Sequence, residues 1–348
     1  MSTTTTTPMK DNKSLTDRAA GRLLVDPTLG VLALLLLICL ISAFALPVFL
    51  NPSNLYNLLN TSLIVMILAM GMTVVLISGG IDLSIGTTMA LCAGVAATTM
   101  NYGLPLIAAL LAALATGALV GIGNGLLITR LGLPDFIATL AMLGFASGIL
   151  YIWTKGVPII GYMVPEFYTI GGLTPLVGPL TLPMLIALAV ALVLGGILGS
   201  TRLGTHFFAV GSSKTGAMQS GVRVDRIRAQ AYIVSGLAAA VAGIIMAGRN
   251  TNVPADLGNG YEIQAIAAAV IGGAALTGGR GRILGAILGA ITLAATVNLI
   301  NLVGVPSSYQ KIVIGAILVV AVLANRLSAV ISAKVRQRRA LVLEGIPA

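Results

Sequence analysis

Asp82 is the side chain of this 348-residue sequence whose type and setting most clearly allow chemistry. It is the only charged residue between Pro27 and Thr129, and the residues on both sides of it are mostly apolar. If this stretch lies in a membrane, an ionised carboxylate costs at least about 2.5 kcal/mol unless it faces a partner, a helix end or a water-filled cavity. Two interpretations stay open. Asp82 caps a helix that begins near Ser84 by accepting backbone N–H bonds, or it lines a gate or pore.

A few other polar side chains interrupt the apolar stretches. Ser84, Asn124 and Asn298 are, with Asp82, the candidate gate or pore residues, because hydroxyl and amide groups can bind a polar solute without adding charge. The same groups also make packing hydrogen bonds between helices. Asn60 and Asn301 fit either role, and the sequence does not name the solute.

Catalysis and metal binding are not indicated. The single histidine, His206, has no cysteine or acid at ligand spacing, and Cys39 and Cys92 lie in apolar runs where cysteine usually packs. The segment Gly211–Thr215 resembles a phosphate loop only superficially, because that motif needs glycine directly before the lysine. We therefore predict a protein that is not an enzyme and holds no cofactor, so any ATP is hydrolysed by another chain.

Composition shows what surrounds these residues. Charged residues make up 9% of the chain, against about 25% in an ordinary soluble domain, and hydrophobic residues make up 57%. Such a chain cannot cover itself with polar surface, so lipid must be part of its solvent. This excludes a soluble enzyme, a disordered protein and a disulfide scaffold. The net charge of +10 does not indicate nucleic acid, because the cations lie between apolar bands.

The apolar bands predict an all-α polytopic membrane protein with about ten transmembrane helices. The predicted spans are 29–46, 55–77, 84–100, 104–129, 136–153, 180–200, 229–248, 263–276, 283–303 and 308–324. We divide the chain into a disordered cytoplasmic tail at 1–26, a transmembrane domain at 27–326 and a basic cytoplasmic tail at 327–348.

The positive charges support this number of spans. With ten spans and both termini in the cytoplasm, 17 of the 20 Lys and Arg fall on the cytoplasmic side. Only Lys155, Arg249 and Lys311 fall outside. The segment 202–228 is the long charged interior segment on the inner side. It is either a solvated connector or a docking site that uses a short helix near 217–222.

Two glycine-rich segments share a loose pattern. Ser78–Gly86 and Ile271–Gly279 both contain two glycines, two residues, leucine, a hydroxyl residue, one residue and glycine, at an offset of 193 residues. Each lies at a predicted break between two spans. Paired breaks of this kind are typical of transporters built from repeats, so we predict two pseudo-repeated halves.

Four segments closely resemble the permease subunits of bacterial ribose-type sugar ABC importers, the membrane components of binding-protein-dependent transport systems. They are GGIDLSIG at Gly79–Gly86, AVGSSKTGAMQSGV at Ala209–Val222, SGLAAAVAGIIMAGR at Ser235–Arg249 and GYEIQAIAAAVIGGAALTGGRG at Gly260–Gly281. The resemblance runs from about residue 29 to residue 326. It implies a multi-pass protein of the bacterial inner membrane that carries a ribose-like monosaccharide into the cytoplasm.

The resemblance also implies partners. These are a second permease copy in a homodimer, a periplasmic sugar-binding protein and a cytoplasmic ATPase subunit. The segment 202–228 then contains the loop that couples the permease to the ATPase. The predicted coupling residues are Gly211, Ser213, Ala217, Ser220 and Gly221. The chain departs from the family pattern at Thr205, at Ser212-Ser213 and at Gly216-Ala217, which leaves the identity of the ATPase open.

The polar segment 249–262 is a simple linker or the docking surface for the external protein, with Asp256, Tyr261 and Glu262 as candidates. Two other transporters remain as alternatives. One is the related importer branch for branched-chain amino acids or nucleosides, which GGIDLS disfavours. The other is an ion-coupled secondary transporter, which usually needs ionisable residues along its path, and the spans offer little beyond Asp82.

Overall fold

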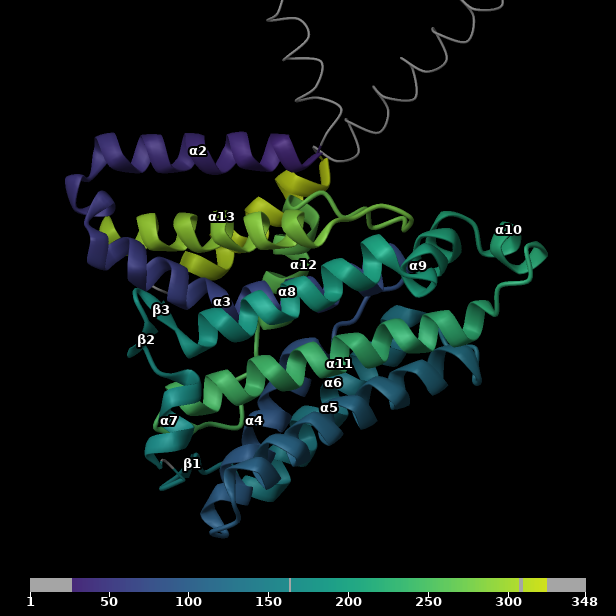
Figure 1. Cartoon of the computed structure of the whole chain (residues 1–348), viewed down its shortest axis with the longest axis horizontal. Helices are drawn as coiled ribbons and strands as arrows, with labels where there is room; N and C mark the ends of the chain where they lie inside the picture. Colours follow the sequence, from purple (N-terminus) through teal and green to yellow (C-terminus); the bar gives the residue numbers. More distant parts are fainter. Residues whose placement is uncertain (1–26, 163, 307–308, 324–348) are drawn as a thin grey trace, which may run out of the picture.

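The computed structural model describes residues 27–162, 164–306 and 309–323. The predicted tails, 1–26 and 327–348, lie outside the described residues. The described chain is predominantly helical with nearly no sheet, which confirms the all-α class (Figure 1). Its strands form two short antiparallel pairs, β1 (Ile159–Ile160) with β4 (Asn252–Val253) and β2 (Pro175–Val177) with β3 (Leu180–Thr181).

Seven described helices are long and apolar enough to cross a membrane. They are α2 (Pro27–Ala45), α3 (Pro52–Ile77), α5 (Leu106–Thr129), α6 (Asp135–Thr154), α8 (Leu182–Ser200), α11 (Val224–Arg249) and α13 (Ile283–Leu302). The other three predicted spans coincide with shorter helices: α4 (Ile85–Asn101) and the two short apolar helices α12 (Tyr261–Ile271) and Gln310–Leu323. The remaining helical elements are η1 (Pro47–Leu50), α7 (Pro165–Gly171), α9 (Arg202–Ser212) and α10 (Lys214–Gln219).

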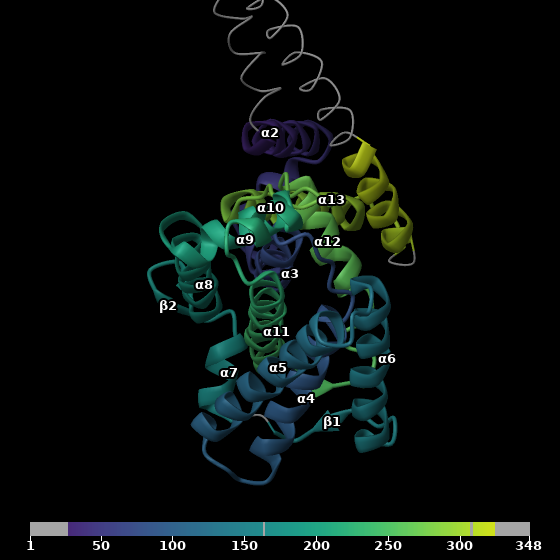
Figure 2. The ribbon, with the colours of Figure 1, turned by 90° about the vertical axis from the view of Figure 1, so that its right-hand side faces the viewer.

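Two helices form the centre of the molecule. α3 and α11 are buried along most of their length, whereas α2, α5, α6 and α8 expose most of their surface. α11 packs against α4 and α5 on one side, and α3 packs against α12 and α13 on the other (Figures 1 and 2). Glycine makes the closest of these contacts possible: Gly117 and Gly121 of α5 lie against the backbone of α11 at Gly236 and Ile233.

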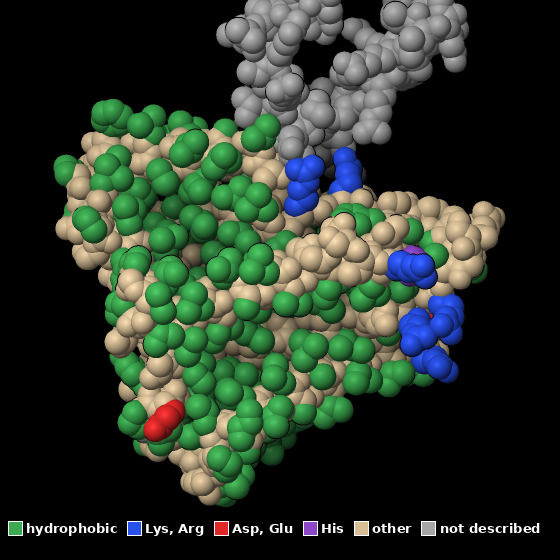
Figure 3. Space-filling view, viewed as in Figure 1, with side chains coloured by type: hydrophobic (Ala, Val, Ile, Leu, Met, Phe, Trp, Pro, Cys, Tyr) green, Lys and Arg blue, Asp and Glu red, His purple; other side chains and the backbone are tan. Residues whose placement is uncertain are grey.

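Positive charge gathers at one end of the helices. Figure 3 shows Lys and Arg side chains at one end of the visible face and mainly hydrophobic side chains over the rest. We call this the basic end. It contains the end of α5, the α8–α9–α10 segment, the start of α11 and the α12–α13 connection (Figure 1). The opposite end carries both strand pairs and α7.

Two of the short helices begin inside the protein rather than at its ends. α3 ends at the basic end, and the non-helical residues 78–84 return into the interior before α4 starts. There Gly86 lies against the backbone of Gly258, just before α12. α12 has 11 residues, about 16 Å of helix, or roughly half of a 30 Å hydrocarbon core. The span predicted at 263–276 is therefore a half-length helix.

The two glycine-rich segments resemble each other only at their first turn. After α3 the N–H of Gly80 donates to Val75 O at 3.0 Å, and after α12 the N–H of Ala274 donates to Ala269 O at 3.0 Å. Gly79 and Gly273 take the positive φ values of +78° and +87° that this helix ending requires. The equivalent residues are thus 194 apart, one more than the sequence pattern predicts. Beyond this turn one segment extends inward and the other folds into a tight turn at 275–278.

Candidate functional site

Asp82 is buried where the returning segment meets α11. Its Oδ1 accepts hydrogen bonds from the Ser84 N–H at 2.9 Å and the Ser84 hydroxyl at 2.6 Å. Its Oδ2 accepts from the Ser235 hydroxyl of α11 at 2.7 Å. The side chain is 2% exposed. The carboxylate therefore holds the start of α4 in a cap-like manner and also fastens it to α11.

The hydroxyl of Ser84 extends this cluster to α5. The Asn124 side-chain N–H donates to Ser84 Oγ at 2.8 Å. Asn124 is fully buried, and its Oδ1 has no hydrogen-bond partner among the described residues. Three predicted gate residues, Asp82, Ser84 and Asn124, thus lie together, and Ser235 completes the cluster. We call these four residues the Asp82 cluster.

A second polar group supports the backbone of the returning segment. The carbonyl of Ile81 accepts hydrogen bonds from the hydroxyls of Thr139, at 3.3 Å, and Tyr232, at 3.4 Å. Next to them Arg228 of α11 forms an ion pair with Asp135 at the start of α6. Non-helical backbone at membrane depth is tolerated only where the protein satisfies its polar groups, and these side chains do so here. Sequence analysis did not identify this group, because its members are far apart in the chain.

The fourth gate candidate, Asn298, lines a cavity elsewhere. This cavity, about 280 Å³ in volume, lies between α3, α12 and α13. We call it the polar cavity. Seven of its thirteen lining residues carry neutral hydrogen-bonding side chains: Asn57, Thr61, Ser62, Tyr261, Gln264, Asn298 and Asn301. Asn60, in contrast, is fully buried and is bonded to Tyr56 and Thr181, which is a packing role.

The three docking candidates of the 249–262 segment lie in different surroundings. Tyr261 is the first residue of α12 and lines the polar cavity. The Glu262 carboxylate accepts from the Gly260 N–H at 3.1 Å and lies beside Gly86 at the start of α4. Asp256 is exposed and makes no side-chain hydrogen bond with the described residues. The structure therefore does not bring the three together on one outer surface.

Sequence analysis also missed a signal in this segment. Asp256–Leu257 precedes α12 as Asp82–Leu83 precedes α4, and the two helices begin side by side at Gly86 and Gly258. The shared Asp-Leu pair before two internal helix starts was available from the sequence. The glycine pairs are more frequent, since this chain has 42 glycines, and they made the Asp-Leu pair less conspicuous.

The predicted coupling loop is a helix–turn–helix at the basic end. Ser213 caps α10, since its Oγ accepts from the Gly216 N–H at 3.0 Å, and Ser220 donates to the Gly216 carbonyl at 2.9 Å. Ala217 is buried, and Gly221 takes a positive φ of +80° in the following turn. Ser213 and Ser220 are exposed, but their hydroxyls bond to the backbone of the segment, so these predicted residues shape it. Met218, which the sequence did not single out, is 65% exposed.

Gly211, the fifth coupling residue, lies at a junction of three backbone segments. It packs against the Ile77 carbonyl at the end of α3 and against the turn that contains Gly278 and Gly279. The Gly279 N–H also donates to Ile77 O at 2.9 Å. We call these contacts the glycine junction. It connects α9 directly to the end of α3, where the segment 78–84 begins, and to the turn before α13, so a displacement of α9 acts on both.

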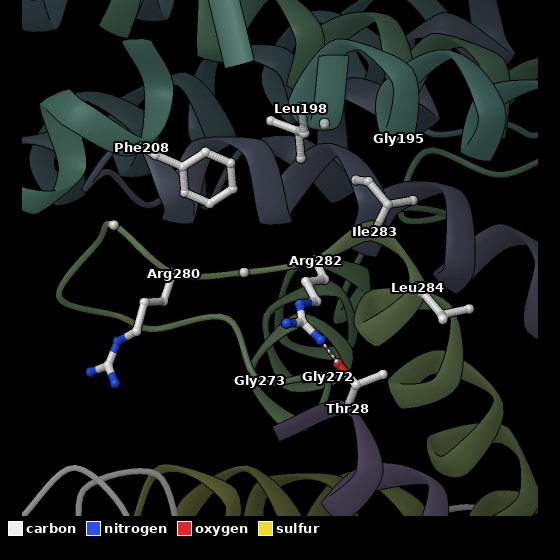
Figure 4. A pocket seen from close by; sticks show the side chains of 13 residues that line it. Thr28, Gly195, Leu198, Phe208, Gly272, Gly273, Arg280, Arg282, Ile283 and Leu284 are labelled. Atoms are coloured by element: carbon white, nitrogen blue, oxygen red, sulfur yellow. Dashed lines mark hydrogen bonds between the residues drawn. The ribbon is translucent and has the colours of Figure 1, made fainter. Parts of the chain in front are cut away.

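A larger cavity, about 520 Å³, lies at the basic end between α2, α8, α9 and the α12–α13 connection. Figure 4 shows Phe208 on one side of it and Arg282 directed toward Thr28, to which it donates at 3.3 Å. Its lining is otherwise mainly glycine and aliphatic residues. It therefore offers far fewer neutral hydrogen-bonding side chains than the polar cavity.

Comparison with known proteins identifies what these elements belong to. Residues 54–322 match the family described as the permease component of a branched-chain amino acid transport system. This match contains both returning segments, the polar cavity and the coupling loop. The chain belongs to this family.

Similar permeases of known systems cover most of the chain. The ribose import permease protein RbsC of Escherichia coli (strain K12) is 37% identical over 299 residues, which is 85% of this chain and 92% of that protein. RbsC of Bacillus subtilis (strain 168) is 35% identical over 302 residues, covering 87% and 92%. The autoinducer 2 import system permease protein LsrC of Yersinia pseudotuberculosis serotype O:3 (strain YPIII) is 35% identical over 277 residues, covering 79% and 78%. No solved structure matched the chain.

Proposed function

We propose that this chain is the membrane-spanning permease subunit of an ABC importer that brings a ribose-like monosaccharide into the cytoplasm. The observation that carries the proposal is the 37% identity to a ribose import permease over 92% of that protein's length. The family description names branched-chain amino acids, but the relatives compared above import ribose or autoinducer 2. This favours a sugar over the amino acid alternative.

We infer that the chain crosses the inner membrane ten times, within a permease domain at 27–326. Seven crossings use the long helices, and α4, α12 and Gln310–Leu323 make the other three. Each of the two internal helices α4 and α12 completes its crossing with the non-helical segment before it. The basic end then faces the cytoplasm, because Lys and Arg are retained on that side, and both termini lie there.

An inverted repeat accounts for the arrangement of the core helices better than the pattern shared by the two glycine-rich segments does. α3, a returning segment, α4 and α5 correspond to α11, a returning segment, α12 and α13. α3 ends at the basic end and α11 at the opposite end, so the two units run in opposite directions. The packing supports this, because α11 contacts α4 and α5 just as α3 contacts α12 and α13. In such transporters the substrate passes at the interface of the repeats.

The α9–α10 segment is the proposed contact with the ATPase. Its exposed Met218 is suited to an apolar groove on a partner, and Gly211 connects the segment to the glycine junction. ATP binding can shift the permease between two states only if the ATPase binds those states differently. A sugar-binding protein is proposed to dock at the opposite end, where Asp256 is exposed, and a second permease copy completes a homodimer.

Uptake by cells tests this proposal. A strain that lacks the gene is complemented with the wild-type chain and supplied with radiolabelled D-ribose, with glucose present to maintain ATP. We expect ribose uptake to depend on the chain, to persist with a protonophore and to stop with vanadate. Uptake that a protonophore abolishes while ATP is maintained would instead identify an ion-coupled transporter, and equal ribose uptake with and without the gene would exclude ribose.

A further inference from the structure

We propose that the polar cavity between α3, α12 and α13 is the monosaccharide-binding site within the permease. The proposal rests on the proposed function and goes further by naming the residues that contact the sugar. These are Asn57, Tyr261 and Gln264, with the hydroxyls of Thr61 and Ser62 beside them.

The chemistry of the lining suits a neutral sugar. Among the described residues that line the cavity none is charged, while amide- and hydroxyl-bearing residues make up more than half of them. Amides and hydroxyls both donate and accept hydrogen bonds, as the hydroxyl groups of a neutral sugar do. A carboxylate or ammonium ligand would find no opposite charge in this lining, and Arg249, which interacts electrostatically with Tyr261, donates to the Gly171 and Asn60 carbonyls. The volume of 280 Å³ lies just below the usual range of about 300–1,000 Å³ for small-molecule sites, which suits a single sugar unit.

Some polar side chains of the cavity are already hydrogen-bonded, and others remain available to a ligand. Asn298 and Asn54 bond to each other through their amides at 2.9 and 3.1 Å, and Asn301 accepts from Gln310 at 2.6 Å. By contrast, the side chains of Asn57, Tyr261 and Gln264 make no hydrogen bond with any described residue. They come from two helices, α3 and α12, and line one cavity. These three side chains are free to bind a ligand without breaking existing bonds.

The hydroxyls of Thr61 and Ser62 donate to carbonyls of their own helix, at 2.9 and 2.7 Å. Each retains the capacity to accept a hydrogen bond from a sugar. The ring of Tyr261 also offers an apolar face next to its hydroxyl, which suits the C–H and O–H groups of a sugar ring. One cavity thus contains donors, acceptors and an aromatic surface.

The cavity lies on the side from which sugar would be delivered. Asn57 and Asn301 lie toward the opposite end of α3 and α13, the end remote from the basic residues, whereas Tyr261 begins α12 inside the protein. Just beyond Tyr261, Gly86 and Gly258 bring the starts of α4 and α12 into backbone contact. The cavity therefore extends from the side of sugar delivery to the start of α12. Neutral polar side chains exposed at membrane depth normally face water or protein rather than lipid.

The experiment uses the complemented strain, with D-ribose as the probe. The double variant Asn57→Leu with Gln264→Leu removes two of the free groups. We expect its maximal ribose uptake to fall about tenfold, as the loss of two ordinary hydrogen bonds implies. The half-saturating concentration should stay unchanged, because capture from solution is done by the sugar-binding protein. Thr296→Val on α13 is the matched control, since Thr296 bonds within its helix and does not line the cavity.

A second measurement does not depend on transport. In a chain with Cys39 and Cys92 replaced by alanine, a membrane-impermeant maleimide should label Gln264→Cys, and D-ribose should protect it. Tyr102→Cys, 77% exposed at the opposite end, should label equally with and without ribose. Wild-type uptake together with an unlabelled or unprotected Gln264→Cys overturns the site but leaves the proposed function intact. Absence of ribose uptake by the wild type overturns both.

Discussion

Gly211→Ala is expected to uncouple ATP hydrolysis from uptake while the protein still inserts in the membrane. A methyl group at Gly211 would lie 2.6 Å from the Gly279 backbone nitrogen and closer still to the Ile77 carbonyl oxygen. Ordinary carbon contacts need about 3.5 Å, so α9 and the two backbone segments must separate by on the order of 1 Å. Backbone atoms cannot rotate away as a side chain can, so the glycine junction opens.

The size of the effect follows from this overpacking, which typically costs about 1–3 kcal/mol. If the cost falls only on the state in which the junction is closed, it shifts the balance between two permease states about 5- to 150-fold. The assay is ribose uptake and ATP hydrolysis by the importer in proteoliposomes. We expect uptake to fall at least about fivefold, while hydrolysis stimulated by the sugar-binding protein continues.

Gly216→Ala is the matched control, because a methyl group there meets only the Ser213 side chain, at 3.2 Å or more. It lies inside α10, where alanine favours helix by up to about 1 kcal/mol over glycine. We expect near wild-type coupling. Equal coupling in Gly211→Ala and Gly216→Ala would refute the role of the glycine junction.

Substitutions of Asp82, Arg228 and Tyr162 test the described interior and loops. Asp82→Ala leaves the Ser84 N–H and the Ser235 hydroxyl without an acceptor and should lower thermal stability by about 1–3 kcal/mol. Asp82→Asn should unfold near the wild-type temperature, and full ribose uptake by it would exclude a gate role for the charge. Arg228→Ala leaves Asp135 unpaired and should cost up to about 3–5 kcal/mol, partly recovered by adding Asp135→Asn; no recovery contradicts the ion pair. Burial raises the pKa of Tyr162, in the loop before α7, to about 12 from an ordinary value near 10. The stabilisation of the folded state by the protonated Tyr162 side chain should therefore be complete below pH 10 and be lost as the pH rises through 12. The variant Tyr162→Phe should lack this pH dependence when unfolding is measured over a range of pH.

The positions of the helices were predictable because hydrophobicity and charge are local properties of the sequence. Every predicted span coincides with a helix among the described residues, including the short Gln310–Leu323. Composition could not show at which depth in the membrane a helix begins. The non-helical residues 78–84 and 254–260 are as short as ordinary loops. Only the hydrogen bond of Asp82 to Ser235 of α11 and the contact of Gly258 with Gly86 place them inside.

The candidate site was predictable in part for a similar reason. A lone buried acid such as Asp82 is conspicuous, whereas its partner Ser235 lies 153 residues away and carries no distinctive pattern. Tyr261 and Asn298 were assigned to different roles because they come from different segments, yet they line one cavity. Which distant residues line the same cavity depends on how the helices pack, and the spacing of residues in a single sequence does not show this.

Labelling of the coupling segment tests the central claim, the ten-crossing orientation with α9 and α10 in the cytoplasm. Met218→Cys is made in a chain with Cys39 and Cys92 replaced by alanine and is exposed to a membrane-impermeant maleimide. The account predicts labelling in inverted inner-membrane vesicles and none in intact spheroplasts, with Tyr102→Cys giving the reverse. Labelling of Met218→Cys in intact spheroplasts would contradict it.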